Sequence, residues 1–64
     1  MDFIDLKIMD MCERYVSKWL RDAQLPVCDG VRFSWLFIRG ENRLKIVYNS
    51  MIKYVDYDEI KKAS

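Results

Sequence analysis

The sequence has 64 residues, of which 52% are hydrophobic and 33% are charged, so it is long enough for one small domain and too apolar for a disordered segment. Its net charge of +1 excludes overall charge as a reason to bind nucleic acid or an anionic membrane. Because it has two cysteines and no histidine, it lacks an ordinary base for a nucleophile and the ligand set of a zinc site. We therefore expect no enzymatic activity, no metal and no cofactor.

The N-terminal residues predict a cytoplasmic protein. Asp2 and Asp5 stand where a secretory signal peptide needs basic residues, and no apolar run reaches the length of a membrane span. We therefore expect no membrane partner. In a reducing cytoplasm, Cys12 and Cys28 are expected to be free thiols.

Residues 2–24 have the spacing of one amphipathic helix, with Asp2 as its N-cap and Pro26 ending it. Apolar side chains three or four residues apart share one face: Ile4, Ile8, Met11, Cys12, Tyr15, Val16, Trp19, Leu20 and Ala23. One edge of the helix carries four basic residues interleaved with Asp10 and Glu13: Lys7, Arg14, Lys18 and Arg21. We interpret this edge as a solvated face rather than as a track for a phosphate backbone.

Residues 31–49 form the densest aromatic and β-branched stretch, and they predict a β-hairpin around which the chain is organised. Gly40-Glu41 suits a two-residue turn with glycine in a left-handed conformation, and a four-residue loop over residues 39–42 keeps the same pairing. That pairing joins Phe33 with Tyr48, Trp35 with Ile46, and Phe37 with Leu44. These side chains then share the face that meets the helix, where Trp19 and Trp35 are expected to contact each other.

The C-terminal residues allow two interpretations. In the first, Asn49-Ser50 turns the chain into a third strand, 51–55, and Asp56 with Glu59 forms a capping box that opens a short helix. The clustered acids Asp56, Asp58 and Glu59 then reflect a helix N-terminus rather than a magnesium site. In the second, residues 50–62 form one helix, which we disfavour because its apolar residues would not share a face.

These elements predict an α+β fold in a single domain, residues 1–64. One long amphipathic N-terminal helix packs on a two- to three-stranded antiparallel sheet, and a short C-terminal helix follows. One helix covers only one face of such a sheet, so the opposite face is left open. Residues 31–54, which include this sheet, contain five bases and one acid, a net charge of +4.

The open face is the predicted partner-binding surface, and Ile52 shares it with the candidate site residues Arg32, Leu36, Ile38, Arg43, Lys45, Val47 and Tyr54. An apolar patch with a basic rim is typical of a protein interface. We expect a small protein-binding module that self-associates as a homo-oligomer or binds a host protein, as a phage or mobile-element inhibitor does. The alternative is a nucleic-acid-binding regulator that uses Tyr54 and the basic residues of the same face.

Overall fold

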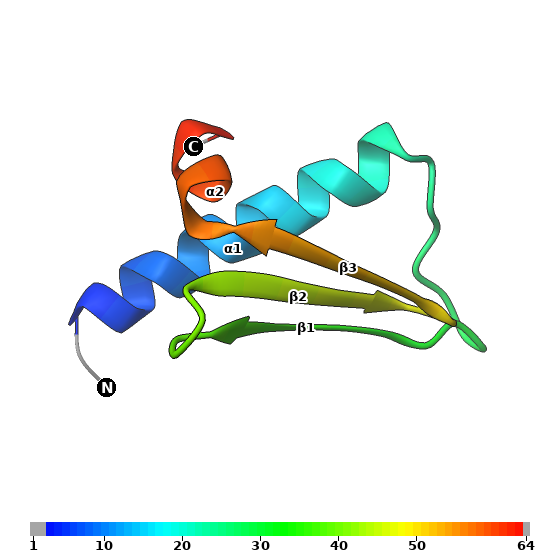
Figure 1. Ribbon diagram of the computed structural model, residues 1–64. Helices are drawn as coiled ribbons and strands as arrows, with labels where there is room; N and C mark the ends of the chain where they lie inside the picture. The colour runs from blue at the N-terminus through cyan, green and yellow to red at the C-terminus, as the bar shows by residue number, and fades with distance from the viewer. Residues whose placement is uncertain (1–2, 64) are drawn as a thin grey trace.

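The structure is a computed structural model that describes residues 3–63. The elements follow one another in the order α1 (Phe3–Asp22), β1 (Phe33–Ile38), β2 (Arg43–Tyr48), β3 (Met51–Asp56) and α2 (Tyr57–Ala63) (Figure 1). The three strands form one antiparallel sheet in the order β1-β2-β3, so the predicted α+β fold is confirmed. The predicted N-cap Asp2 and the side chain of Ile4 lie outside the described part of the chain.

The long helix α1 ends at Asp22, two residues earlier than the sequence predicts. The Leu25 N–H donates to the carbonyl oxygen of Leu20 at 2.9 Å, and the Gln24 N–H donates to that of Arg21 at 3.1 Å. Gln24 has a left-handed φ of 56°. These two bonds form a Schellman motif, so the helix is closed before Pro26 is reached. Within residues 3–63 no helix is both long and apolar enough to cross a membrane.

The register of the hairpin is the predicted one, and its connection is the four-residue loop that the sequence allowed rather than the two-residue turn. β1 and β2 pair from Phe33↔Tyr48 to Ile38↔Arg43, and a four-residue loop, 39–42, joins them. The left-handed residue of this loop is Asn42, with a φ of 55°, whereas Gly40 has no positive φ. The two-residue Gly40-Glu41 turn is therefore wrong. The register is the same for both connections, because the four-residue loop takes one residue from the end of each strand. The facing of every side chain is therefore unchanged.

The third strand is present, so the interpretation of residues 50–62 as a single helix is wrong. β3 pairs with β2 from Tyr48↔Met51 to Arg43↔Asp56, one residue beyond the predicted strand. Asp56 directly precedes α2, as the predicted N-cap would. The Tyr57 N–H, the first of α2, donates to the carbonyl oxygen of Asn42 at 3.1 Å and so continues the pairing of β2 with β3 by one residue. This bond ties α2 to the loop between β1 and β2.

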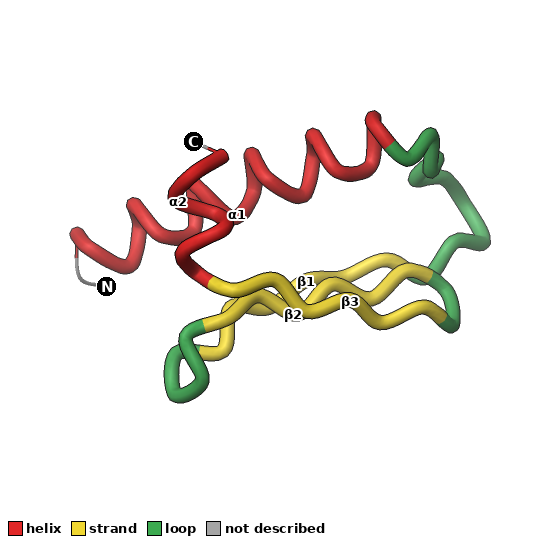
Figure 2. The backbone as a smooth tube through the Cα atoms, turned by 45° about the horizontal axis from the view of Figure 1, so that its top comes forward, coloured by secondary structure: helices red, strands yellow, loops and turns green. Residues whose placement is uncertain are grey.

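The core lies between the sheet and the two helices, which cover the same face of the sheet (Figure 2). Its buried residues come from α1, β2, β3 and α2: Cys12, Val16, Leu44, Ile46, Tyr48, Val55 and Ile60. Trp19 and Trp35 each pack against this cluster, but the predicted contact between their rings is absent from the described ring contacts. Instead, Phe33 meets Tyr48 with ring centroids 6.4 Å apart, and Phe37 meets Tyr57 at 5.8 Å.

Candidate protein-binding face

The face of the sheet opposite the helices is called the outer face here. The strand register arranges its nine residues in three rows that run from β1 across β2 to β3: Ser34–Val47–Ile52, Leu36–Lys45–Tyr54 and Ile38–Arg43–Asp56. In the part of the chain that the structure describes, no helix or loop covers this face (Figure 2). The outer face follows directly from strand alternation, because every second side chain points away from the core.

Large apolar side chains on the outer face are exposed to solvent. Leu36 is 64% exposed, Ile52 is 55% exposed, and Tyr54 is 48% exposed. Val47 lies directly opposite Ile52 and diagonally from Leu36, so it joins these side chains into one apolar strip. Contiguous exposed apolar side chains of this kind are a common feature of interaction surfaces.

Lys45 lies at the centre of the outer face, in the middle row of the central strand. Its neighbours across the two strand pairs are Leu36 and Tyr54. It is half-buried, and it makes no ion pair in the described part of the chain. The long aliphatic part of a lysine side chain can lie along such neighbours while its ammonium group stays in water. Lys45 therefore puts an unpaired positive charge within the apolar strip, next to the row Ile38–Arg43–Asp56.

Arg43 is held by contacts within the protein. One terminal nitrogen of its guanidinium group lies 2.5 Å from a carboxylate oxygen of Glu41, and the group stacks 4.2 Å from the centre of the Tyr54 ring. Its Nε atom is buried and has no hydrogen-bond partner. Arg43 thus contributes a neutralised charge to the outer face and covers one side of the ring that a nucleic-acid base would need for stacking.

Arg32 lies at the end of the outer face, one residue pair beyond the row Ser34–Val47–Ile52. The Asn49 N–H donates to the carbonyl oxygen of Arg32 at 2.6 Å, and the Arg32 N–H donates to the Asn49 side-chain oxygen at 3.1 Å. The Arg32 side chain is exposed. The structure therefore places all seven predicted site residues on the same side of the sheet.

Three members of the outer face, Ser34, Ile52 and Asp56, were not among the seven predicted site residues, although Ile52 was expected to share their face. Ser34 is small and carries no signal of its own. Asp56 was interpreted only as a helix cap, although the alternation of β3 also points its side chain to the outer face beside Arg43. The pairing of Arg43 with Glu41 was missed as well, because it depends on the loop conformation and not on strand alternation.

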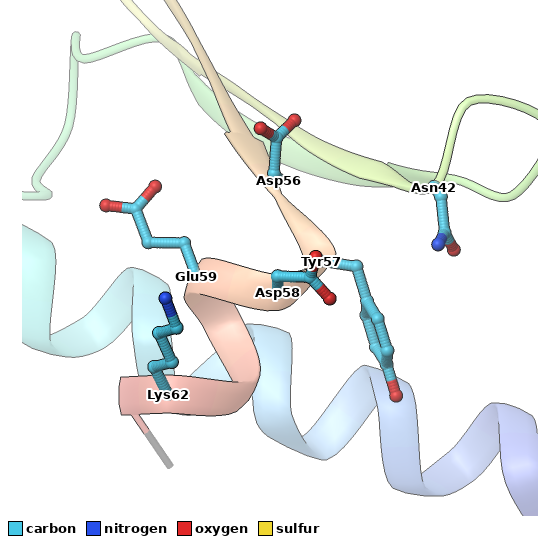
Figure 3. Close-up of a pocket in the computed structure, with 6 residues that line it drawn as sticks. All are labelled: Asn42, Asp56, Tyr57, Asp58, Glu59 and Lys62. Carbon is cyan, nitrogen blue, oxygen red and sulfur yellow. The ribbon is translucent and has the colours of Figure 1, made fainter.

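The three clustered acids near the start of α2 do not form a metal site. Asp56, Asp58 and Glu59 line a shallow pocket with Asn42, Tyr57 and Lys62, and their carboxylates point in different directions (Figure 3). Among the side chains that the structure describes, no group of three acidic, cysteine or histidine side chains is arranged to hold a metal ion. Negative charge at a helix N-terminus is favourable in itself, and this explains their clustering.

The thiols and the basic edge of α1 offer no reactive arrangement. Cys12 is fully buried, and burial raises the pKa of its thiol, so it is uncharged at neutral pH. Cys28 is exposed, and the two cysteines are free, as predicted.

On the basic edge of α1, Arg14 lies 3.2 Å from Asp10 in an exposed ion pair within the helix. Such pairs contribute little to stability and leave little net charge.

The arrangement of the outer face is thus an apolar strip around one free lysine, with the nearby arginine already paired. No protein-family model, curated protein or solved structure matches the chain.

Proposed function

We propose that this protein binds another protein through the outer face and catalyses no reaction itself. The observation that carries the proposal is the exposure of Leu36, Ile52 and Tyr54 on a sheet face that no described element covers. Exposed apolar area of this kind lowers the free energy of a complex when a partner removes it from water. In the cytoplasm such a module would act by occupying its partner, and inhibition of a host protein, as by a phage or mobile-element product, is the role we propose.

The charge of the outer face indicates which kind of partner surface would complement it. Lys45 makes no ion pair in the described part of the chain, and Asp56 is its diagonal neighbour on β3, so a partner that covers the face is favoured when it places a carboxylate near the ammonium group. If two copies met face to face about a central two-fold axis, Lys45 would meet Lys45. We therefore propose an apolar partner surface that carries an Asp or Glu, rather than a second copy, for this face.

The test compares two leucines that differ in location but not in chemistry. Leu36 on the outer face is 64% exposed and Leu6 on α1 is 54% exposed, so Leu36→Asp and Leu6→Asp are matched substitutions. The wild-type chain and both variants are immobilised and exposed to an extract of the source cell. The protein that is retained is then identified and titrated against each of them.

We expect Leu36→Asp to weaken binding of that protein at least tenfold, because it puts a charge into the apolar strip, and Leu6→Asp to leave it unchanged. Lys45→Glu should weaken it as well by repelling the partner's carboxylate. Equal binding by Leu36→Asp and Leu6→Asp would show that the outer face is not the interface.

A nucleic-acid-binding role for the same face is the second candidate. It is favoured by the position of the unpaired Lys45 beside Tyr54 in one row of the sheet. The pairing of Arg43 with Glu41 speaks against it, because few free positive charges are then left for phosphates. Titration of mixed single-stranded oligonucleotides separates the two roles, since micromolar affinity that falls steeply with salt supports this one and no binding at low salt rules it out.

A further inference from the structure

β1 is an edge strand without a charged residue. The order β1-β2-β3 leaves one side of β1 unpaired, and no described element lies beyond it in Figure 1. Its sequence, FSWLFI, has no charge, proline or glycine, whereas the other edge strand, β3, carries Lys53 and Asp56. Proteins normally protect free strand edges with charged residues, and β3 has this protection while β1 does not.

The free edge presents the backbone groups of three aromatic residues. The bond from the Asn49 N–H to the Arg32 carbonyl oxygen makes this a hydrogen-bonded pair of the antiparallel ladder. Because such pairs alternate along a ladder, Ser34, Leu36 and Ile38 bond to β2 through their backbone. The N–H and C=O groups of Phe33, Trp35 and Phe37 therefore point to the open side of β1.

We propose that two copies of this chain pair through their β1 strands, antiparallel, and form a continuous six-stranded sheet. In a register centred on Trp35, Phe33 of one copy lies opposite Phe37 of the other, and Trp35 lies opposite Trp35. All three residues with free backbone groups then exchange hydrogen bonds across the two-fold axis. Their aromatic side chains form cross-strand pairs on the helix side, and Ser34 lies opposite Leu36 on the outer side.

A second copy fits this edge better than it fits the outer face. The strand is uncharged, so two copies meet there without like charges inside the pairing, whereas contact between outer faces about a central two-fold axis brings Lys45 against Lys45. The two-fold axis of the edge pairing runs perpendicular to the sheet. It therefore keeps both outer faces on the same side of the dimer, and the pairing is independent of the partner proposed for those faces.

The decisive variant removes a backbone donor at the edge. Phe33→Pro deletes an N–H that points away from β2, a position where an edge strand tolerates proline. Phe33→Ala is its matched control, because both variants lose the ring contact with Tyr48 and only one loses the N–H. Far-ultraviolet circular dichroism and urea denaturation establish that both variants are folded, and sedimentation equilibrium from micromolar to millimolar concentration measures the dimer.

We expect the wild type and Phe33→Ala to form a dimer. We expect Phe33→Pro to raise the dissociation constant about a hundredfold relative to Phe33→Ala, about tenfold for each of the two hydrogen bonds lost. A wild-type chain that stays monomeric throughout, or a Phe33→Pro variant that associates as Phe33→Ala does, overturns the proposal.

A second pair of variants tests the edge even if proline perturbs folding. Ser34 on β1 and Ile52 on β3 are both exposed on the outer face, but only Ser34 lies on the proposed pairing strand. Ser34→Lys places two like charges diagonally across the two-fold axis and should weaken the dimer, less so at high salt. Ile52→Lys should not change it. Dissociation by Ile52→Lys and not by Ser34→Lys would mean that the copies associate through their outer faces instead.

Discussion

The guanidinium group of Arg43 lies over the ring of Tyr54, 4.2 Å from its centre, while it also contacts the carboxylate of Glu41. The ring contact joins β2 to β3 across the outer face, and the ion pair with Glu41 neutralises the positive charge of Arg43. The Nε atom of Arg43 is buried without a hydrogen-bond partner. The outer face is therefore less basic than the sequence suggests, and Lys45 at its centre and Arg32 at its end carry its remaining positive charge.

Arg43→Met should change the free energy of unfolding by no more than about 1 kcal/mol. The variant loses the ring contact and an ion pair that is partly exposed, but it also removes a buried nitrogen that is not hydrogen-bonded. Methionine keeps an apolar chain over Tyr54. Urea denaturation measures the difference, and a loss above about 3 kcal/mol would mean that the Arg43 contacts hold the sheet together.

Gly40→Ala should leave stability unchanged or raise it by about 0.4–1 kcal/mol. Gly40 has no positive φ, and an added Cβ meets no atom within 4 Å, so alanine only reduces the freedom of the unfolded chain. Asn42→Ala should cost about 1 kcal/mol, because Asn42 holds the left-handed position of the loop. Thermal denaturation of both variants distinguishes the loops, since a two-residue turn with glycine first requires the opposite ranking.

Tyr48→Phe should destabilise the protein by about 1–2 kcal/mol. The Tyr48 hydroxyl donates to the carbonyl oxygen of Pro26 at 2.5 Å, which ties the segment after α1 to the central strand. Phenylalanine leaves that carbonyl without its partner. Hydrogen exchange should rise locally in residues 25–31. Tyr54→Phe is the control, because the Tyr54 side chain is 48% exposed and its change should cost almost nothing.

Stability should fall at alkaline pH. Burial raises the pKa of the Cys12 thiol, and burial together with the charge of Glu59 raises the pKa of Tyr15. The unfolded chain then loses these protons at lower pH than the folded chain does. The stabilisation is complete below the pKa of an unfolded cysteine, about 8.5, and is lost as pH rises through the folded values. Urea denaturation from neutral pH upward should show this fall.

Two variants assign the alkaline fall to its groups. Cys12→Ala should remove the part of the pH dependence that begins near the thiol pKa, even though the smaller side chain lowers stability at every pH. Tyr15→Phe should remove the part at higher pH. If both variants keep the wild-type slope, groups other than Cys12 and Tyr15 cause it.

Strand alternation and helix periodicity were sufficient to predict the fold. The alternation from Phe33 to Ile38 and from Arg43 to Tyr48 leaves a single register that puts all the aromatic side chains of these strands on one side, so the facing of each residue was predictable. The choice between the two-residue turn and the four-residue loop was not predictable. Gly40 and Asn42 both tolerate a left-handed backbone, and only tertiary context selects which of them adopts it. The Schellman end of α1 was missed for the same reason, since Gln24 stands where glycine is usual.

Side-chain contacts were predicted less well than facing. Trp19 and Trp35 both face the core, but a shared face does not determine which rings meet, and Phe33 and Phe37 took tyrosine neighbours instead. The composition of the outer face was readable from alternation, including its lysine. That Arg43 is paired and Lys45 is not depends on the loop that carries Glu41. The paired and unpaired charges that indicate the kind of partner could therefore be identified only from the structure.

In β1, alternate side chains face the core and the proposed binding surface, and substitutions at two neighbouring residues test this division. Trp35 packs against the core and Leu36 is 64% exposed, so Trp35→Ala should cost about 2–4 kcal/mol and Leu36→Ala about 0.5 kcal/mol. Urea denaturation at a concentration low enough to separate any dimer measures both. A severe loss for Leu36→Ala together with tolerance of Trp35→Ala would contradict this division and would place the binding surface on the aromatic side of the sheet.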